Sequence, residues 1–195
     1  MIALDTSALC LLFVPGAPAV ASGSDKPIKF AKERIEALIE RTAKCGDQIL
    51  IPTPALCELL IKVPPGRIPD LLAELNGSVW YRVESFDLAA AIELADRTAK
   101  AIARGDKRDG VQADWTKIKF DRQIMAIAIV NGASELISQD PHLIALGKRW
   151  DFRVIGLEDL PLPLSCVAPP LLAHLDEEEP PVDRLPPDAE SGKKT

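Results

Sequence analysis

Four acidic residues that lie far apart in the sequence stand where predicted strands end or helices begin. Asp5 closes the first apolar segment of the chain, and Asp140 follows the fourth one by two residues. Glu58 lies on the helix expected after the second strand, and Asp121 in the first turn of a helix expected at 118–130. Parallel strands bring their carboxyl ends to one edge of a sheet, where ligands of such sheets bind. The sequence therefore predicts that the four carboxylates converge at one edge.

Carboxylates held close together raise one another's pKa unless a cation neutralises them. Mg²⁺ and Mn²⁺ prefer oxygen ligands and retained water, so they are the expected cations. The chain has only two histidines, and its four cysteines form no C-x-x-C pair, so a metal here would be held by oxygen. A divalent ion in such a site can activate water for attack on a phosphodiester. The residues thus favour metal-dependent phosphodiester hydrolysis.

Each acid also has a purely structural interpretation. Asp5 and Asp140 precede helix starts, where aspartate is a favoured N-cap, and a proline follows Asp140 at the first helical position. Asp121 would favour a helix dipole, and Glu58 would lie on a solvated face. Against this, Asp121 stands three and seven residues before Ile124 and Ala128, so it shares the face of core positions. The ordered set of four is stronger evidence than any one member.

Short apolar strands alternate with helices along the chain, which predicts an α/β protein with a parallel sheet between two helical layers. Loops rich in small or polar residues separate the elements at 15–27 and 105–117. The expected strands cover residues 2–4, 49–51, 79–83, 135–138 and 152–155, and the expected helices 6–14, 28–45, 53–62, 68–75, 88–102, 118–130 and 141–147.

The composition of the 195 residues, 47% hydrophobic and 27% charged, excludes a wholly disordered chain. A net charge of −6 argues against a protein built on a basic nucleic-acid surface. Residues 161–195, however, hold eight of the 17 prolines and a charge of −4, which leaves −2 on residues 1–160. Without the four predicted site acids, residues 1–160 carry +2. We expect one domain at 1–160 and a flexible, solvated tail at 161–195. The net charge of the chain therefore does not exclude RNA binding by the domain.

The amino-terminal sequence predicts a cytoplasmic protein that does not associate with a membrane. The apolar run at 8–14 is too short to span a bilayer, and the only charge before it is that of Asp5, where a secretory signal needs basic residues. The four cysteines are widely spaced, and three lie in apolar segments. Buried thiols are therefore expected rather than disulfides.

Four segments resemble, in order, the acidic motifs of the PIN domain family. They are MIALDTSAL at residues 1–9, IPTPALCELL at 51–60, FDRQIMAIAIVNGA at 120–133 and ELISQDPHL at 135–143. The resemblance covers roughly residues 1–157, and it implies a compact α/β/α domain with metal-dependent ribonuclease activity. Many small PIN proteins are toxins that a partner antitoxin holds inactive, and they often form homodimers. The chain is longer than those small toxins.

The resemblance also implies roles for individual residues. Asp5, Glu58, Asp121 and Asp140 would be the catalytic metal ligands for Mg²⁺ or Mn²⁺, with Ser7 and Ser138 as supporting polar groups. Asp5 and Asp121 are the expected direct ligands, whereas Glu58 and Asp140 would either bind metal or position water. A metal-bound water would be the nucleophile in RNA cleavage.

RNA binding by this chain would need local basic groups, because phosphate neutralisation dominates affinity. Trp115 would either stack on a base or cover the core. The basic candidates are Lys107, Arg108, Lys117, Lys119 and Arg122.

Two other functions fit parts of the sequence. A non-catalytic PIN-like module would keep the fold and the acids and act through protein or RNA partners. Phosphotransfer, as in receiver domains, would need an acceptor aspartate on a central strand and a late lysine. Asp5 closes the first strand, and no suitable lysine follows the last strands, so this alternative is weaker.

Overall fold

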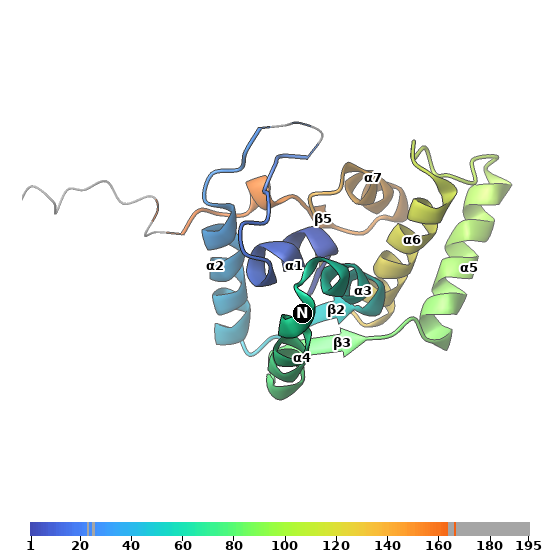
Figure 1. Cartoon of the computed structure of the whole chain (residues 1–195). Coiled ribbons are helices and arrows are strands. Elements are labelled where there is room, and N and C mark those ends of the chain that lie inside the picture. The colour runs from blue at the N-terminus through green and yellow to red at the C-terminus, as the bar shows by residue number, and fades with distance from the viewer. Residues whose placement is uncertain (23, 25, 164–165, 167–195) are drawn as a thin grey trace, which may run out of the picture. The chain divides into compact units, whose positions relative to one another are not determined.

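The computed structural model describes residues 1–22, 24, 26–163 and 166, and residues 1–163 form one compact unit (Figure 1). Five parallel strands make a single sheet in the order β3-β2-β1-β4-β5. The predicted tail at 161–195 lies outside the described residues, except for 161–163 and 166. The strands are β1 (Ile2–Leu4), β2 (Ile49–Pro52), β3 (Tyr81–Glu84), β4 (Leu136–Ile137) and β5 (Val154–Ile155).

Within the described residues, seven α-helices connect and cover the strands, and each predicted strand and helix has its counterpart. Two short 3₁₀ helices follow α3 and β5, at Pro65–Arg67 and Leu157–Asp159. The α-helices are α1 (Thr6–Phe13), α2 (Ala31–Lys44), α3 (Thr53–Lys62), α4 (Ile68–Gly77), α5 (Leu88–Ala103), α6 (Trp115–Val130) and α7 (Pro141–Trp150).

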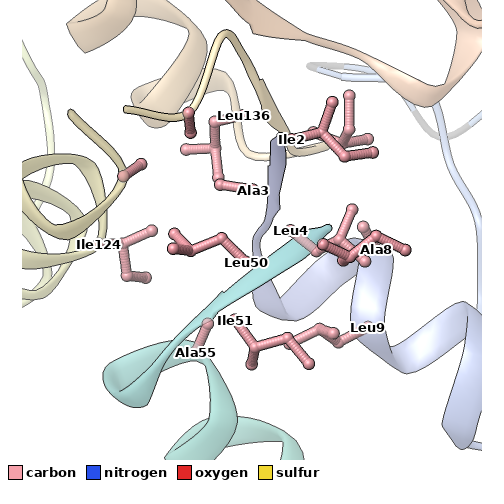
Figure 2. Packing of buried hydrophobic residues seen from close by; sticks show 14 of the residues in the cluster. Ile2, Ala3, Leu4, Ala8, Leu9, Leu50, Ile51, Ala55, Ile124 and Leu136 are labelled. Atoms are coloured by element: carbon pink, nitrogen blue, oxygen red, sulfur yellow. The ribbon is translucent and has the colours of Figure 1, made fainter. Parts of the chain in front are cut away.

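The central strands are buried on both faces, which accounts for their uninterrupted apolar sequences. Figure 2 shows Leu50 of β2 on the side of Ile124 from α6. Leu4 and the neighbouring Ile51 lie on the other side, toward Leu9 of α1 (Figure 2). Helices therefore pack against opposite faces of the sheet, an arrangement compatible with three α/β/α layers.

Two helix starts differ from the sequence-based expectation, and one of them matters for the site. α6 begins at Trp115 rather than at 118, because the Asp114 carbonyl accepts a hydrogen bond from the Ile118 amide at 3.0 Å. Asp121 is therefore in the second turn of α6, not the first, and a helix-dipole role at the first turn is wrong. α2 begins at Ala31, because Phe30 before it adopts a left-handed φ of 57°.

Asp109 fastens the loop between α5 and α6 to the body of the domain. Its buried carboxylate accepts hydrogen bonds from Arg104 at 2.7 Å, from Arg122 at 2.9 Å and from the Trp150 indole at 3.3 Å. These donors belong to the end of α5, to α6 and to α7. One carboxylate thus links the loop to two helices and to the terminus of a third.

The strand order places a topological switch point between β1 and β4. The chain proceeds from β1 through β2 to β3 in one direction and then returns to place β4 on the other side of β1. In open parallel sheets, ligands bind beyond the carboxyl ends of the strands at such a point. Residues 5–7 and 138–140 therefore occupy the position in this fold that is best suited to a site.

Candidate functional site

Asp5 lies at the switch point with its carboxylate held by two serines. Its backbone amide bonds to the Ile137 carbonyl at 3.0 Å and so continues the ladder between β1 and β4. Its Oδ2 accepts hydrogen bonds from Ser138 at 2.8 Å and from Ser7 at 3.2 Å. Asp5 makes no side-chain cap bond to α1, so an N-cap role does not account for this buried carboxylate.

The two serines also connect the strand ends to each other. Ser7 Oγ accepts a hydrogen bond from the Gln139 amide at 2.9 Å, and Ser138 Oγ accepts one from the Asp140 amide at 3.0 Å. The turns after β1 and β4 are therefore joined by hydroxyl groups that donate to Asp5. Such bonding fixes the rotamer of the carboxylate.

Asp140 caps the amino-terminal end of α7 and is also linked to Asp121 through Lys117. Its Oδ1 accepts from the His142 amide at 2.8 Å, so the expected N-cap bond is present. Its Oδ2 accepts a hydrogen bond from the Lys117 ammonium. The same ammonium lies 3.6 Å from Asp121 Oδ1, so Lys117 bridges acids from two elements.

Glu58 joins the site from α3, on the side of α1. Its Oε2 accepts a hydrogen bond from Thr6 Oγ1 at 2.9 Å. Glu58, Asp5 and Asp140 line one pocket of about 320 Å³, so three of the four predicted acids border a common space. Its other lining residues are Thr6, Ser7, Lys62, Lys117, Gln139 and Pro141.

Burial, reinforced by neighbouring acids, raises the pKa of two of the carboxylates, Asp121 and Asp5. Burial raises the pKa of Asp121 to about 7; the charges of Asp140 and Asp5 add to this rise, while Lys117 opposes it. Burial also raises the pKa of Asp5, despite its hydrogen bond from Ser138. For Lys117, burial lowers the pKa, but the hydrogen bond to Asp140 and the nearby acids outweigh it, so the net shift is upward. The site therefore favours a cation among its carboxylates.

The donor set fits a hard divalent cation, although the acids are not arranged as a finished ligand shell. All four donors are carboxylates, and Asp121, 6% exposed, has an Oδ2 with no hydrogen-bond partner among the described residues. Within the same part of the chain, no three His, Cys, Asp or Glu side chains are gathered closely enough to hold a metal ion. Lys117 occupies the space between Asp121 and Asp140. A metal shell would require this ammonium to leave.

The structure separates the basic residues that were predicted to contact RNA. Lys117 lines the acidic pocket, and Lys119 is exposed on the same helix. Lys107 and Arg108 are exposed in the loop before α6, where Arg108 donates to the Ala113 carbonyl at 3.0 Å. The prediction that Arg122 contacts RNA is wrong. Its side chain is 1% exposed and its guanidinium is bound to Asp109, so it is unavailable to RNA.

Trp115 is partly buried and packs against two basic side chains, one of them Arg122. The Lys107 ammonium lies 4.2 Å from the centroid of the indole ring, and the Arg122 guanidinium carbon lies 5.5 Å from it. These cation–π contacts favour the structural interpretation of Trp115 over base stacking.

Sequence reasoning missed several residues of the site. Thr6 and Gln139 adjoin Asp5 and Asp140 in sequence, which is the only signal they carried. Gln139 donates to the Val20 carbonyl at 2.8 Å and so holds the 15–27 loop beside the site. Lys117 was predicted to contact RNA, not acids. Its position four residues before Asp121 was the available signal, since residues four apart share a helix face.

No protein-family model matches the chain, and a search of curated proteins found no relative. The resemblance to PIN domains therefore rests on the four motifs alone. Within the described residues, no helix is long and apolar enough to cross a membrane.

Proposed function

We propose that this protein is a PIN-like, Mg²⁺- or Mn²⁺-dependent endoribonuclease. The observation that carries the proposal is that Asp5, Asp140 and Glu58 line one pocket at the switch point of a parallel sheet, with Asp121 linked to Asp140 through Lys117. The ordered motifs around these acids supply the link to RNA cleavage. Buried carboxylates with raised pKa values in a cleft are typical of functional sites.

Each acidic residue of the site would have its own role in such a reaction. A bound divalent ion would supply a Lewis acid and an activated water. Asp5 and Asp121 would hold the ion, with Asp5 oriented by Ser7 and Ser138. Glu58 and Asp140 would complete the ligand set or orient water.

Incubation of the full chain with a structured RNA, with Mn²⁺ and with EDTA, tests the proposal. We expect internal cleavage in Mn²⁺ alone and a loss of at least about 100-fold in Asp121→Asn and Asp5→Asn, since each removes a metal ligand. Asp96→Asn, on the exposed face of α5, is the control and should cleave normally. Cleavage that persists in EDTA or in Asp5→Asn would contradict the proposal.

A non-catalytic binding module is the second candidate function, and a separate pocket favours it. This pocket of about 410 Å³ lies beside the end of α1 and is bordered by Lys32, Arg67 and Leu71. Its wall is largely apolar, and Lys32 and Arg67 outnumber the one lining acid, Glu74, so the pocket suits a partly apolar peptide segment with an acidic group. Titration calorimetry with Mn²⁺ separates the two candidates, because a module without a metal site gives no heat that disappears in Asp121→Asn.

The toxin assignment implies an antitoxin and a homodimer, and a face of α5 suits the dimer. Leu88, Ile92 and Ile102 on α5 are 77%, 62% and 55% exposed. With the exposed Ala95 and Ala99 between them, they follow the alternating spacing of four and three that pairs helices. We propose that α5 of a second copy covers this face.

A further inference from the structure

The acidic site contains one basic side chain that bridges two of its carboxylates. The Lys117 ammonium bonds to Asp140 of the turn after β4 and lies 3.6 Å from Asp121 on α6. Its side chain is 43% exposed and lines the pocket shared with Asp5 and Glu58. The internal cation therefore reaches the carboxylates from the solvent side rather than from the core.

The surroundings of Lys117 point to a second cation that would take its place. Asp121 is buried, and its Oδ2 has no hydrogen-bond partner in the part of the chain that the structure describes. A monovalent ammonium thus leaves one carboxylate oxygen of the acidic site unsatisfied. A divalent ion carries twice the charge and accepts several oxygen ligands, so it would satisfy these carboxylates better than Lys117 does.

Resting on the proposed function, we propose that Lys117 is an exchangeable counter-ion of the acidic site. A divalent cation displaces its ammonium from Asp121 and Asp140, and the released ammonium then binds a phosphate of the RNA. Lys117 is thereby a substrate-binding residue that is available only when the site is loaded. Metal binding and RNA binding become coupled through one side chain.

The geometry allows this exchange without a change of fold. Lys117 lies in the first turn of α6, four residues before Asp121, and its flexible four-carbon stem carries the ammonium. A change of side-chain rotamer moves the ammonium from the carboxylates to the mouth of the pocket. The Lys117 ammonium is then no longer paired with a carboxylate, and its free positive charge at the mouth of the pocket attracts phosphate.

Mn²⁺ binding by the full chain tests the first half of the proposal. We expect Lys117→Gln to bind Mn²⁺ about tenfold more tightly than the wild type in titration calorimetry, because the metal no longer displaces a cation. Lys100→Gln is the matched control: Lys100 pairs with Asp96 at 2.5 Å on an exposed face of α5, and its loss should leave Mn²⁺ affinity unchanged. Unchanged or weaker Mn²⁺ binding by Lys117→Gln would overturn the proposal.

RNA binding tests the second half. Fluorescence anisotropy of a labelled RNA hairpin is measured in Ca²⁺ and in EDTA, with the RNA checked by gel for integrity. We expect Lys117→Gln to weaken RNA binding about three- to tenfold in Ca²⁺, with a salt dependence reduced by about one charge, and to have little effect in EDTA. An equal loss of RNA affinity in both conditions would mean that Lys117 is no exchangeable ion.

The outcomes separate this proposal from the proposed function. If the wild type binds Mn²⁺ and cleaves RNA while Lys117→Gln behaves like it in both assays, only the exchange is wrong. If neither the wild type nor Lys117→Gln binds Mn²⁺, both proposals are wrong. Thermal unfolding of each variant shows whether it is still folded, so that a change in binding can be attributed to the substituted side chain.

Discussion

Asp121 must lose a proton before it can hold a cation at neutral pH. Its pKa is raised to about 7 by burial, with the charges of Asp140 and Asp5 adding to the shift. We therefore expect Mn²⁺ affinity to rise between about pH 5.5 and 7 and to level off above pH 8, since metal competes with the proton below the pKa. Calorimetry in buffers of different ionisation enthalpy would detect proton release, which disappears in Asp121→Asn. Affinity that does not vary across this range would contradict the assignment of Asp121 as a ligand.

Because its pKa is raised, Asp121 lowers the free energy of unfolding of the metal-free protein at neutral and higher pH. The unfolded chain binds this proton only below an ordinary carboxyl pKa of 3.8, whereas the native chain keeps it to about 7. The native state thus binds more protons in this window, and its stability falls as pH rises through it. In EDTA at pH 8, we expect Asp121→Asn to raise the free energy of unfolding by roughly 1–3 kcal/mol, with a clearly smaller gain at pH 5 and almost none once the pH falls below the ordinary carboxyl pKa.

Urea denaturation measures the pH dependence of this gain. Asp96→Asn, which alters an exposed ion pair, is the control and should change stability by less than about 1 kcal/mol at either pH. A variant at Asp121 that is no more stable than the wild type at pH 8 would show that the carboxylate is compensated in the native state.

At the level of single residues, the sequence was informative where periodicity applies. The spacing of Asp121 from Ile124 and Ala128 predicted its buried side correctly. The burial of Arg122 was not predictable, because it depends on Asp109 in a loop 13 residues away. The bridge from Lys117 to Asp140 spans 23 residues, so it likewise follows from tertiary structure.

Among the elements, α6 depends on a loop residue for its place in the domain. Asp109 binds Arg122 on α6, Trp150 on α7 and Arg104 after α5. We expect Asp109→Ala to lower the free energy of unfolding by about 3–5 kcal/mol, because the buried Arg122 would lose its counter-charge. Chemical denaturation measures this loss, with Asp114→Ala, exposed in the same loop, as the control. A loss below about 1 kcal/mol would mean that the loop does not anchor α6.

The elements themselves were predicted well, and their ends less well. Apolar runs of three or four residues marked the buried strands, because both sheet faces exclude water. The start of α6 was placed three residues late, since Thr116 and Lys117 are polar, exposed positions that give no helical apolar pattern. That difference moved Asp121 to the second turn and hid the pairing of Lys117 with Asp121 on one helix face.

For the whole molecule, topology explains why distant acids meet. The strand order reverses between β1 and β4, which brings the turns after Leu4 and Ile137 together. Sequence alone predicted parallel strands, and a common edge followed from that. It did not predict the strand order, which arises from long-range pairing, so the meeting of Glu58 and Asp140 in one pocket needed the structure.

The proposed α5 dimer is also a property of the whole molecule. In an antiparallel pair with its two-fold axis at Ala95, Leu88 of each copy meets Ile102 of the partner, and the two alanines allow close approach. The opposed helix dipoles favour this orientation. We expect the wild type to be a dimer in analytical ultracentrifugation, and Ile92→Glu to be a monomer with a native circular dichroism spectrum. Val79→Glu, exposed in the turn before β3, should remain dimeric. A monomeric wild type, or dimers that tolerate Ile92→Glu, would place the self-association elsewhere or remove it, while leaving the acidic site as a feature of one copy.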